Sequence, residues 1–244
     1  MDIGNHNFAL TESDRLAALA DLAILDSGEE REFDAITKMV ASVLGVPSAA
    51  VSLVGEDRQW FKSRHHVDFT ETPRDVAFCD RVVKQRAPIV VLDTLENELF
   101  RDNPLVTGEP HIRFYAGAPV FTRAGHCIGS LCAIDGTPRA AFTQAEGVFL
   151  QELAMVVGEL IEARRARWES TIAAEVVAST PDAVLATNHA GQIVYWNKAA
   201  QIIFGHSAEE ALGRPITHFI PLGSGNWKAG EFDARRKDGS VFPI

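Results

Sequence analysis

The sequence contains little cysteine, and none of its hydrophobic runs is long. Its 244 residues include three cysteines, Cys79, Cys127 and Cys132. Their small number and irregular spacing argue against a disulfide framework or a zinc knot, and fit a reducing compartment. No run approaches the ~20 apolar residues of a membrane helix, and the first residues lack the basic and apolar segments of a signal peptide. We therefore expect a soluble, cytoplasmic protein without a membrane partner.

Positive charge is scarce relative to negative charge. The 33 acidic residues outnumber the 23 basic residues, which gives a formal net charge of −10. Such a charge repels phosphate backbones, so nucleic acid is not an expected partner. The hydrophobic content of 46% and the charged content of 23% are ordinary for globular proteins. The length is sufficient for two hydrophobic cores.

The first two thirds of the chain predict helices followed by antiparallel strands. Thr11-Glu12-Ser13-Asp14 resembles a helix start, and an apolar stripe from Phe33 to Leu44 indicates a second helix. Period-two runs then predict two hairpins, 48–54 with 59–63 and 114–121 with 127–134. Between the hairpins we expect a helix over 77–85, a strand over 88–93 and a polar loop over 96–110. This loop is either a functional lid or a surface excursion without a role.

The last third predicts a connecting helix and a smaller unit. Thr143-Gln144-Ala145-Glu146 is a capping box, and the helix that it opens extends to Ser179 unless it bends at Arg164–Arg167. Beyond Pro181 the pattern predicts strands, short helices and the start of a final hairpin. These elements are expected at 183–187, 192–196, 197–204, 207–210 and 231–244. Because the chain stops in mid-hairpin, we expect it to be part of a longer protein.

Five blocks of the first domain occur in the order seen in bacterial GAF domains, which residues 14–165 therefore resemble. The blocks are Arg58-Gln59-Trp60-Phe61-Lys62-Ser63, Ala77-Phe78-Cys79, Phe100-Arg101-Asp102-Asn103-Pro104-Leu105-Val106, Ile112-Arg113-Phe114-Tyr115-Ala116-Gly117-Ala118-Pro119 and Gly129-Ser130-Leu131-Cys132-Ala133-Ile134-Asp135. The resemblance implies a small-molecule sensor with a pocket between one face of an antiparallel sheet and the loops and helices above it. It implies sensing and no catalytic residue in this chain.

Residues 180–244 resemble a PAS domain. The similar blocks are Pro181-Asp182-Ala183-Val184, Gly191-Gln192-Ile193-Val194-Tyr195-Trp196-Asn197, Phe204-Gly205 and Arg236-Lys237-Asp238-Gly239-Ser240-Val241-Phe242-Pro243. Only five residues separate Pro221 from Trp227, where the family usually has a helix and a strand that close a cofactor pocket. A domain shortened in this way favours signal transmission or dimerisation over cofactor binding.

Together the two resemblances predict an α+β protein with three parts. These are an antiparallel-sheet GAF-like domain (14–165), a connecting helix (143–179) that overlaps its end, and a smaller antiparallel-sheet PAS-like domain (180–244). In the family such an arrangement precedes a histidine kinase of a two-component system, or a diguanylate cyclase or phosphodiesterase. We expect a homodimer through the connecting helix, whose stripe is Phe149, Leu153, Val156, Leu160 and Ala163.

The GAF resemblance nominates one set of residues for the ligand pocket. The aromatic members are Trp60, Phe78, Phe100, Phe114 and Tyr115, and the others are Lys62, Cys79, Asp93, Asp102 and Asn103. Core packing of the aromatic rings, and a simple turn at Asp102-Asn103-Pro104, are the alternative interpretations. The ligand itself is unknown. No bilin or flavin is expected, because the anchoring Cys-His and Asn-Cys-Arg motifs are missing. No haem is expected either, because the shortened PAS-like part lacks the wall of an enclosed cofactor cavity.

The sequence also suggests two rival functions, and its adjacent histidines raise the question of a metal site. The rivals are a redox enzyme that uses Cys79 and a dimerisation scaffold without a ligand. Cys127 and Cys132 point to opposite faces of one strand unless a bulge at Gly129 intervenes. His65 and His66 are expected on opposite sides of a strand, as surface residues, so no metal site is predicted.

Overall fold

The structure is a computed structural model that describes residues 11–221 and 233–243. The chain divides into two compact units, one that ends at Ala166 and one that begins at Arg167. Both units combine helices with antiparallel strands, so the expected α+β class is confirmed.

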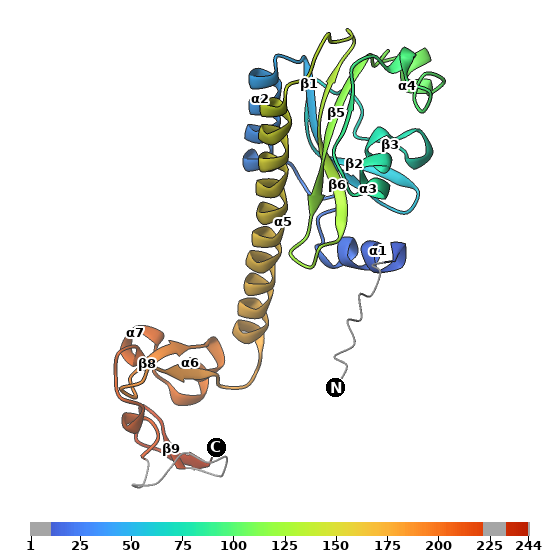
Figure 1. Cartoon of the computed structure of the whole chain (residues 1–244). Helices are drawn as coiled ribbons and strands as arrows, with labels where there is room; N and C mark the ends of the chain where they lie inside the picture. Colours follow the sequence, from blue (N-terminus) through green and yellow to red (C-terminus); the bar gives the residue numbers. More distant parts are fainter. Residues whose placement is uncertain (1–10, 222–232, 244) are drawn as a thin grey trace, which may run out of the picture. The chain divides into compact units, whose positions relative to one another are not determined.

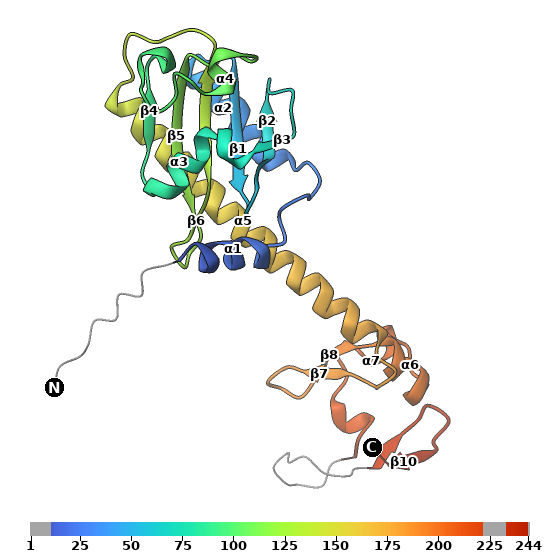
Figure 2. The ribbon, with the colours of Figure 1, turned by 90° about the vertical axis from the view of Figure 1, so that its right-hand side faces the viewer.

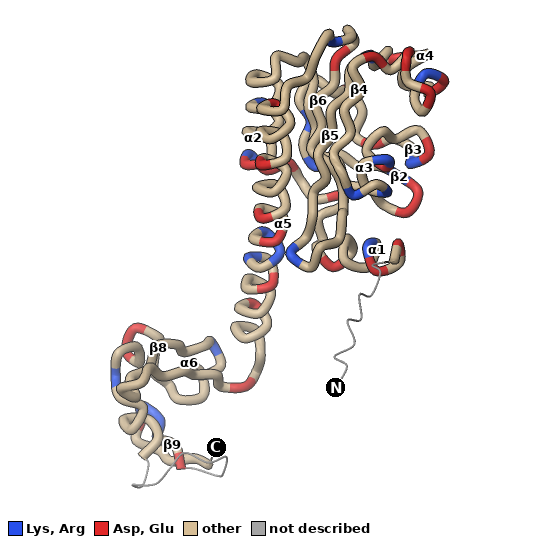
Figure 3. Tube along the Cα trace, in the orientation of Figure 1, with Lys and Arg blue, Asp and Glu red and all other residues tan. Residues whose placement is uncertain are grey.

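The N-terminal unit is built on a six-stranded antiparallel sheet (Figures 1 and 2). The strand order is β3-β2-β1-β6-β5-β4. The strands are β1 (Ser48–Val54), β2 (Arg58–His65), β3 (Glu71–Pro73), β4 (Ile89–Val91), β5 (Phe114–Phe121) and β6 (Cys127–Asp135). Both predicted hairpins form, since β1 pairs with β2 and β5 pairs with β6. The inner strands β1 and β5 carry no charged residue, and charge lies mainly on helices and loops (Figure 3).

Five α-helices surround this sheet within the described residues. They are α1 (Glu12–Asp21), α2 (Arg31–Leu44), α3 (Phe78–Gln85), α4 (Pro104–Thr107) and α5 (Gln144–Ser179). Short 3-10 turns occur at η1 (Arg74–Val76) and η2 (Thr94–Glu96). The helix start predicted at Thr11 forms with a capping box, and the capping box predicted at Thr143 is also formed. The polar loop expected over 96–110 contains α4, which begins after Asn103 because that side chain caps it and Pro104 fits the first helical position.

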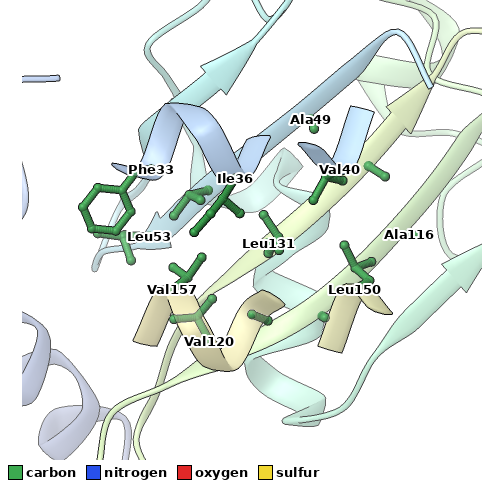
Figure 4. Close-up of a cluster of buried hydrophobic side chains, with 14 of the residues drawn as sticks. Phe33, Ile36, Val40, Ala49, Leu53, Ala116, Val120, Leu131, Leu150 and Val157 are labelled. Carbon is green, nitrogen blue, oxygen red and sulfur yellow. The ribbon is translucent and has the colours of Figure 1, made fainter. Parts of the chain in front are cut away.

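One face of the sheet is covered by α2 and α5. Side chains of these helices and of the sheet form a continuous apolar core, part of which Figure 4 shows. The helix α5 approaches β5 closely at Gly158, where a Cβ atom would lie 2.4 Å from the carbonyl oxygen of Phe121. Only glycine permits this approach, because any side chain would push the helix away from the strand.

The opposite face is covered by α3, α4 and the loops near them. Its core includes Phe78, Cys79, Tyr115 and Cys132, together with Phe100 near α4. The strand β1 contributes to both cores, because Val51 and Leu53 face the α2 side and Ala50 and Val54 face the α3 side.

Two β-bulges set which side chains face which core. In the β1–β2 pair, Ser63 lies opposite Val51 and Phe61 lies opposite Ser52, so Lys62 is the extra residue. In the β5–β6 pair, Gly129 lies opposite Val120 and Cys127 lies opposite Phe121, so Ile128 is extra. The second bulge, next to Gly129, places Cys127 and Cys132 on the same face, which is the exception that the sequence left open. Their separation of five residues, roughly 16 Å along a strand, still excludes a disulfide between them.

The C-terminal unit contains two small antiparallel sheets. One pairs β7 (Leu185–Thr187) with β8 (Ile193–Trp196), and the other pairs β9 (Asp233–Arg235) with β10 (Val241–Pro243). Helices α6 (Lys198–Phe204) and α7 (Ala208–Ala211) and the turn η3 (Ile216–His218) complete the unit. Its core gathers the rings of Trp196, Phe204 and Phe219.

The shortened segment of the PAS-like domain, Leu222–Asn226, lies outside the described residues. The connecting helix is described throughout, and α5 is a single helix of 36 residues without a break at the arginines. Across residues 11–221 and 233–243, none of the helices has the length and apolar character needed to cross a membrane.

Candidate functional site: a ligand cavity on the α3 face

A small cavity of about 20 Å³ lies beneath α3, on the face of the sheet away from α2 and α5. Strands β2, β5 and β6 form its floor, and α3 and the loops near it form its roof. Its walls are Gln59, Phe61, Phe69, Phe78, Cys79, Leu105, Ile112, Tyr115, Cys132 and Ile134. The lining is therefore mainly aromatic and aliphatic, with an amide, a phenol and two thiols as the polar groups.

Tyr115 is held in the cavity by its contacts above and below. A Cβ atom on Gly117 would lie 2.3 Å from the Tyr115 hydroxyl oxygen, so the ring lies directly over that glycine. The hydroxyl donates to Cys79 Sγ at 3.2 Å. The ring of Phe78 packs on Tyr115 at a centroid distance of 5.0 Å and stacks on Phe100 at 4.3 Å.

The two thiols and the phenol influence one another's ionisation. Burial opposes the ionisation of Cys79, but hydrogen bonds from groups that include Cys132 and Tyr115 outweigh it and hold the pKa below its ordinary value. The pKa of Cys132 is raised by its hydrogen bond to Cys79 and by burial. Burial and the nearby Cys79 raise the pKa of Tyr115. If one of the three groups ionises, it is therefore Cys79.

Gln59 has an unpaired polar atom in this cavity. The residue is only 4% exposed, and its Oε1 atom has no hydrogen-bond partner. Its Nε2 atom donates weakly to Thr72 Oγ1, at 3.4 Å. Reversal of the amide would leave the nitrogen unpaired instead, because Thr72 is the amide's one described partner. An unpaired buried amide costs about 1–3 kcal/mol, which a bound molecule can recover.

A wider hollow of about 310 Å³ adjoins the inner cavity. Phe69, Ile112 and Ile134 line both spaces and so form the partition between them. The outer walls include the carboxylates of Asp68, Glu109 and Asp135 and the imidazole of His66. No lysine or arginine occurs among the described residues that line either space.

The residues that the sequence proposed as ligand contacts fall into two groups in the structure. Phe78, Cys79 and Tyr115 line the cavity, and Phe100 supports it through its stack on Phe78. Trp60 and Phe114 belong to the core on the α2 and α5 side, so they do not contribute to this cavity. The reason is strand alternation: their neighbours Phe61 and Tyr115 occupy the α3 face.

Lys62 is also directed away from the cavity, toward the α2 side. Its side chain is fully buried, and its ammonium group donates to Ser27 Oγ at 3.0 Å and to the Gly28 carbonyl at 2.6 Å. It also pairs with Glu30 Oε1 at 2.6 Å, and Arg164 of α5 binds the same carboxylate oxygen at 2.7 Å. These contacts identify Lys62 as a structural tie between β2 and the loop before α2.

Asp93, Asp102 and Asn103 line neither of the two spaces. Asp93 forms a two-point ion pair with Arg113 at 2.9 and 2.6 Å, and its carboxylate caps η2. Asn103 caps α4 and donates to the Val76 carbonyl at 2.9 Å, which fixes α4 beside η1. The Asp102 side chain is 89% exposed. The turn interpretation therefore describes this segment.

Sequence reasoning missed Gln59, Phe61 and Cys132. Each lies in a block that was recognised, and alternation along β2 and β6 contains the signal. Once Trp60 is assigned to one face of β2, Gln59 and Phe61 must occupy the other. The choice between the two faces depends on which helices cover them.

The structure corrects the expectation that His65 and His66 lie on opposite sides of a strand. The rings of His65 and His66 stack at a centroid distance of 4.1 Å instead of pointing apart. His66 follows β2 with a φ of 51°, and this left-handed conformation ends the strand alternation. Burial and the neighbouring His66 lower the pKa of His65. Among residues 11–221 and 233–243, no group of three or more potential metal ligands occurs.

Comparison with known families agrees with the architecture. The GAF domain family matches residues 29–161, more than half of the chain, and the chain belongs to this family. The PAS fold matches residues 173–242. The order of a GAF domain followed by a PAS fold confirms the resemblance found in the sequence, and both are sensory domains.

One curated relative matches part of this chain. It is named cyclic di-GMP phosphodiesterase PA2567, from Pseudomonas aeruginosa, and is 37% identical over 146 residues. The match covers 60% of this chain and 25% of that protein, so the chain spans about a quarter of the relative's length.

Two solved structures of similar fold are both bacterial. The GAF domain of an Acinetobacter phosphoenolpyruvate-protein phosphotransferase is 19% identical, with a TM-score of 0.49, over 63% of this chain and 94% of that one. A free methionine-R-sulfoxide reductase from Neisseria meningitidis is 18% identical, with a TM-score of 0.48, over 62% and 89%. Family membership rests on the sequence match and not on these likenesses.

Proposed function

We propose that the GAF domain senses a small molecule in the cavity beneath α3 and that the chain passes this signal to an output domain. The output is a cyclic di-GMP phosphodiesterase, as in the name of the relative, or else a diguanylate cyclase or a histidine kinase. The observation that carries the proposal is the buried Gln59 amide, which has an unpaired atom and lines a mainly apolar cavity.

The lining indicates the chemistry of the ligand. Aromatic and aliphatic walls favour an apolar body, and the Gln59 amide favours one polar group that reaches the inner cavity. The outer hollow presents Asp68, Glu109 and Asp135, without a lysine or arginine in its described lining. This charge pattern disfavours phosphates and carboxylates. The proposed ligand is therefore uncharged or cationic.

Ligand entry requires movement of the partition. The inner cavity of about 20 Å³ holds no more than a water-sized molecule. Rotation of Phe69, Ile112 or Ile134 would join it to the outer hollow of about 310 Å³, a size at the lower end of typical ligand sites. Ordering of these side chains around a ligand would shift the population of GAF conformations, and this shift is the proposed signal.

The proposal is tested by native mass spectrometry of the purified chain. We expect a bound small molecule on the wild type and on Leu99→Trp, a control at a position that is 60% exposed. Ile134→Trp fills the partition and should remove the adduct. An adduct retained by a folded Ile134→Trp variant would place the ligand elsewhere, and a wild type without any adduct would favour the ligand-free scaffold.

The same proposal includes a cytoplasmic homodimer through α5. Phe149, Leu153 and Leu160 of the expected stripe pack against the core of the N-terminal unit, whereas Val156 is 46% exposed. Other exposed apolar side chains lie on α2 and α5: Met39, Val43, Val148 and Met155. A second copy would bury this surface, with Val156 near its centre. The PAS-like unit is proposed to transmit the signal rather than bind a cofactor.

A further inference from the structure

Two cysteines and a tyrosine line the inner cavity, Cys79 from the α3 roof and Tyr115 and Cys132 from the strands of the floor. The hydroxyl of Tyr115 lies 3.2 Å from Cys79 Sγ and directly over Gly117. Cys132 is the residue opposite Gly117 in the β5–β6 pair. Directly opposed residues have Cβ positions about 5 Å apart, so the Tyr115 hydroxyl lies next to both cysteines. Both cysteines also line the same inner cavity.

The surroundings of Cys79 suit a reactive thiolate. It is the second residue of α3, and the cap residue Ala77 has no side chain that could bond the free N–H groups of the first turn. The helix N-terminus and the Tyr115 hydroxyl both stabilise negative charge on the sulfur. Cys132 lacks a helix N-terminus, and its thiol donates to the Ala50 carbonyl at 3.5 Å. The two cysteines therefore suit different roles, a nucleophile and its partner.

The cavity lined by the two thiols has room only for a very small molecule. Its volume of about 20 Å³ accommodates roughly one water-sized molecule. Gln59 supplies a hydrogen-bonding atom without a partner, and the Tyr115 hydroxyl supplies a second polar group. Hydrogen peroxide has two hydroxyl groups that donate and accept hydrogen bonds, and it is little larger than water.

We infer that Cys79 and Cys132 form a peroxide-sensitive thiol pair that closes to a disulfide in the wall of the cavity. The Cys79 thiolate attacks one peroxide oxygen, so that an S–O bond forms, the O–O bond breaks and hydroxide leaves. The hydroxide takes up the proton that Cys79 released and becomes water. Cys79 is now a sulfenic acid, oxidised by two electrons.

The second step uses Cys132. Its sulfur attacks the sulfenic sulfur of Cys79, the S–S bond forms, the S–O bond breaks, and the hydroxyl leaves as water with the Cys132 proton. In total, two thiols lose two protons and two electrons while one peroxide becomes two waters. The new bond ties α3 to β6 in the wall of the ligand cavity. The chemistry does not depend on the organic ligand; only its effect on signalling rests on the proposed sensing function.

Thiol mapping of the wild-type chain is the direct test. The folded protein is exposed to a small molar excess of hydrogen peroxide, unreacted thiols are alkylated after denaturation, and peptides are analysed without reductant. We expect a Cys79–Cys132 linked peptide that is lost on reduction. Cys127 is the internal control, because it does not line the cavity and burial raises its pKa to about 11. Its thiol should not react with peroxide and should be recovered in the alkylated form.

Variants separate the two roles. Cys132→Ser should stop the reaction at a Cys79 sulfenic acid that a dimedone probe traps, and Cys79→Ser should leave Cys132 reduced. Cys127→Ser should form the linked peptide at the wild-type rate. Gln59→Leu removes the amide and should slow the reaction about fivefold, while circular dichroism shows the native fold.

Any of three results overturns the inference. The first is that Cys79 and Cys132 are both recovered as alkylated thiols after peroxide treatment of the folded wild type. The second is that Cys127 oxidises as fast as they do. The third is that crosslinks form only between chains. Loss of the linked peptide with a retained small-molecule adduct would reject the thiol pair and leave the proposed sensing function intact.

Discussion

At the scale of single residues, a missing side chain is as important as those that line the cavity. Gly117 allows the Tyr115 ring to lie flat on β5, and Cys132 faces it from β6. The position of the phenol therefore depends on one hydrogen atom in place of a methyl group.

Gly117→Ala should destabilise the protein by about 2 kcal/mol, because the new methyl group would overlap the Tyr115 hydroxyl and the ring must leave its place. Urea denaturation followed by tryptophan fluorescence measures the loss. The matched control is Gly28→Ala, where nothing lies within 4 Å of the new Cβ. That change should cost less than ~0.5 kcal/mol. Equal effects of the two changes would contradict the close-contact argument.

Glu12 ties α1 to the sheet through two arginines. Its hydrogen bond with Arg15, opposed by burial and aided by Arg74, lowers the pKa from 4.5 to about 2. Arg15 is buried and also donates to the Val54 carbonyl at 2.6 Å. A carboxylate with a lowered pKa contributes stability above its ordinary pKa. That contribution disappears as the pH falls from about 4.5 to about 2.

Glu12→Gln should therefore destabilise the protein at neutral pH and much less near pH 2. The full pKa shift corresponds to about 3 kcal/mol. Because half of the Glu12 side chain is exposed, solvent screening reduces the expected loss to about 1 kcal/mol. Urea denaturation across this pH range measures the difference from wild type. Glu152→Gln, at an exposed position of α5, should show no such pH dependence; a constant difference for Glu12→Gln would reject the ion-pair explanation.

At the scale of elements, α5 packs closely on β5. Gly158 is the point of contact, and the helix continues from there to Ser179 without a break. The strand β5 also carries Tyr115, which lines the cavity. Under the proposed function, this contact is the route by which a movement of β5 would reach α5.

Gly158→Ala should destabilise the N-terminal unit by about 2 kcal/mol, because its Cβ would lie 2.4 Å from a backbone oxygen that cannot move aside alone. Gly147→Ala in the same helix meets Phe142 at an ordinary 3.8 Å. It should be neutral or stabilise by up to ~1 kcal/mol through helix propensity. Thermal unfolding by circular dichroism compares the two. Stabilisation by both substitutions would show that α5 does not pack tightly on β5.

At the scale of the whole molecule, the exposed apolar residues of α2 and α5 carry the expectation of a homodimer. They lie on helices whose inner faces are already used by the core of the N-terminal unit. The stripe predicted from the sequence is thus divided, since Phe149, Leu153 and Leu160 pack within the unit and Val156 remains available.

Val156→Asp should raise the dimer dissociation constant at least tenfold, because it would place a charge in a desolvated apolar contact. Static light scattering over a concentration series gives the constant. Leu99→Asp, at another exposed apolar position, should leave it unchanged. A wild type that is monomeric at high micromolar concentration would reject the homodimer.

Much of the architecture follows from the sequence alone. The capping boxes at Thr11, Thr143 and Ser207 fix three helix starts, since each depends on residues three positions apart. Alternating apolar residues predict the two hairpins, and the ordered blocks predict the GAF and PAS assignments. These are local signals, which the chain carries before it folds.

Only the tertiary structure decided which residues form the cavity. Alternation shows that Trp60 and Gln59 face opposite sides, but not that α2 and α5 cover the first and α3 the second. The bulge at Ile128, which puts Cys127 and Cys132 on one face, depends on pairing with β5. The unpaired amide of Gln59 likewise exists only because contacts distant in the sequence bury it and leave it without a partner. Burial and pairing are properties of the packed molecule, and they made this face the candidate site.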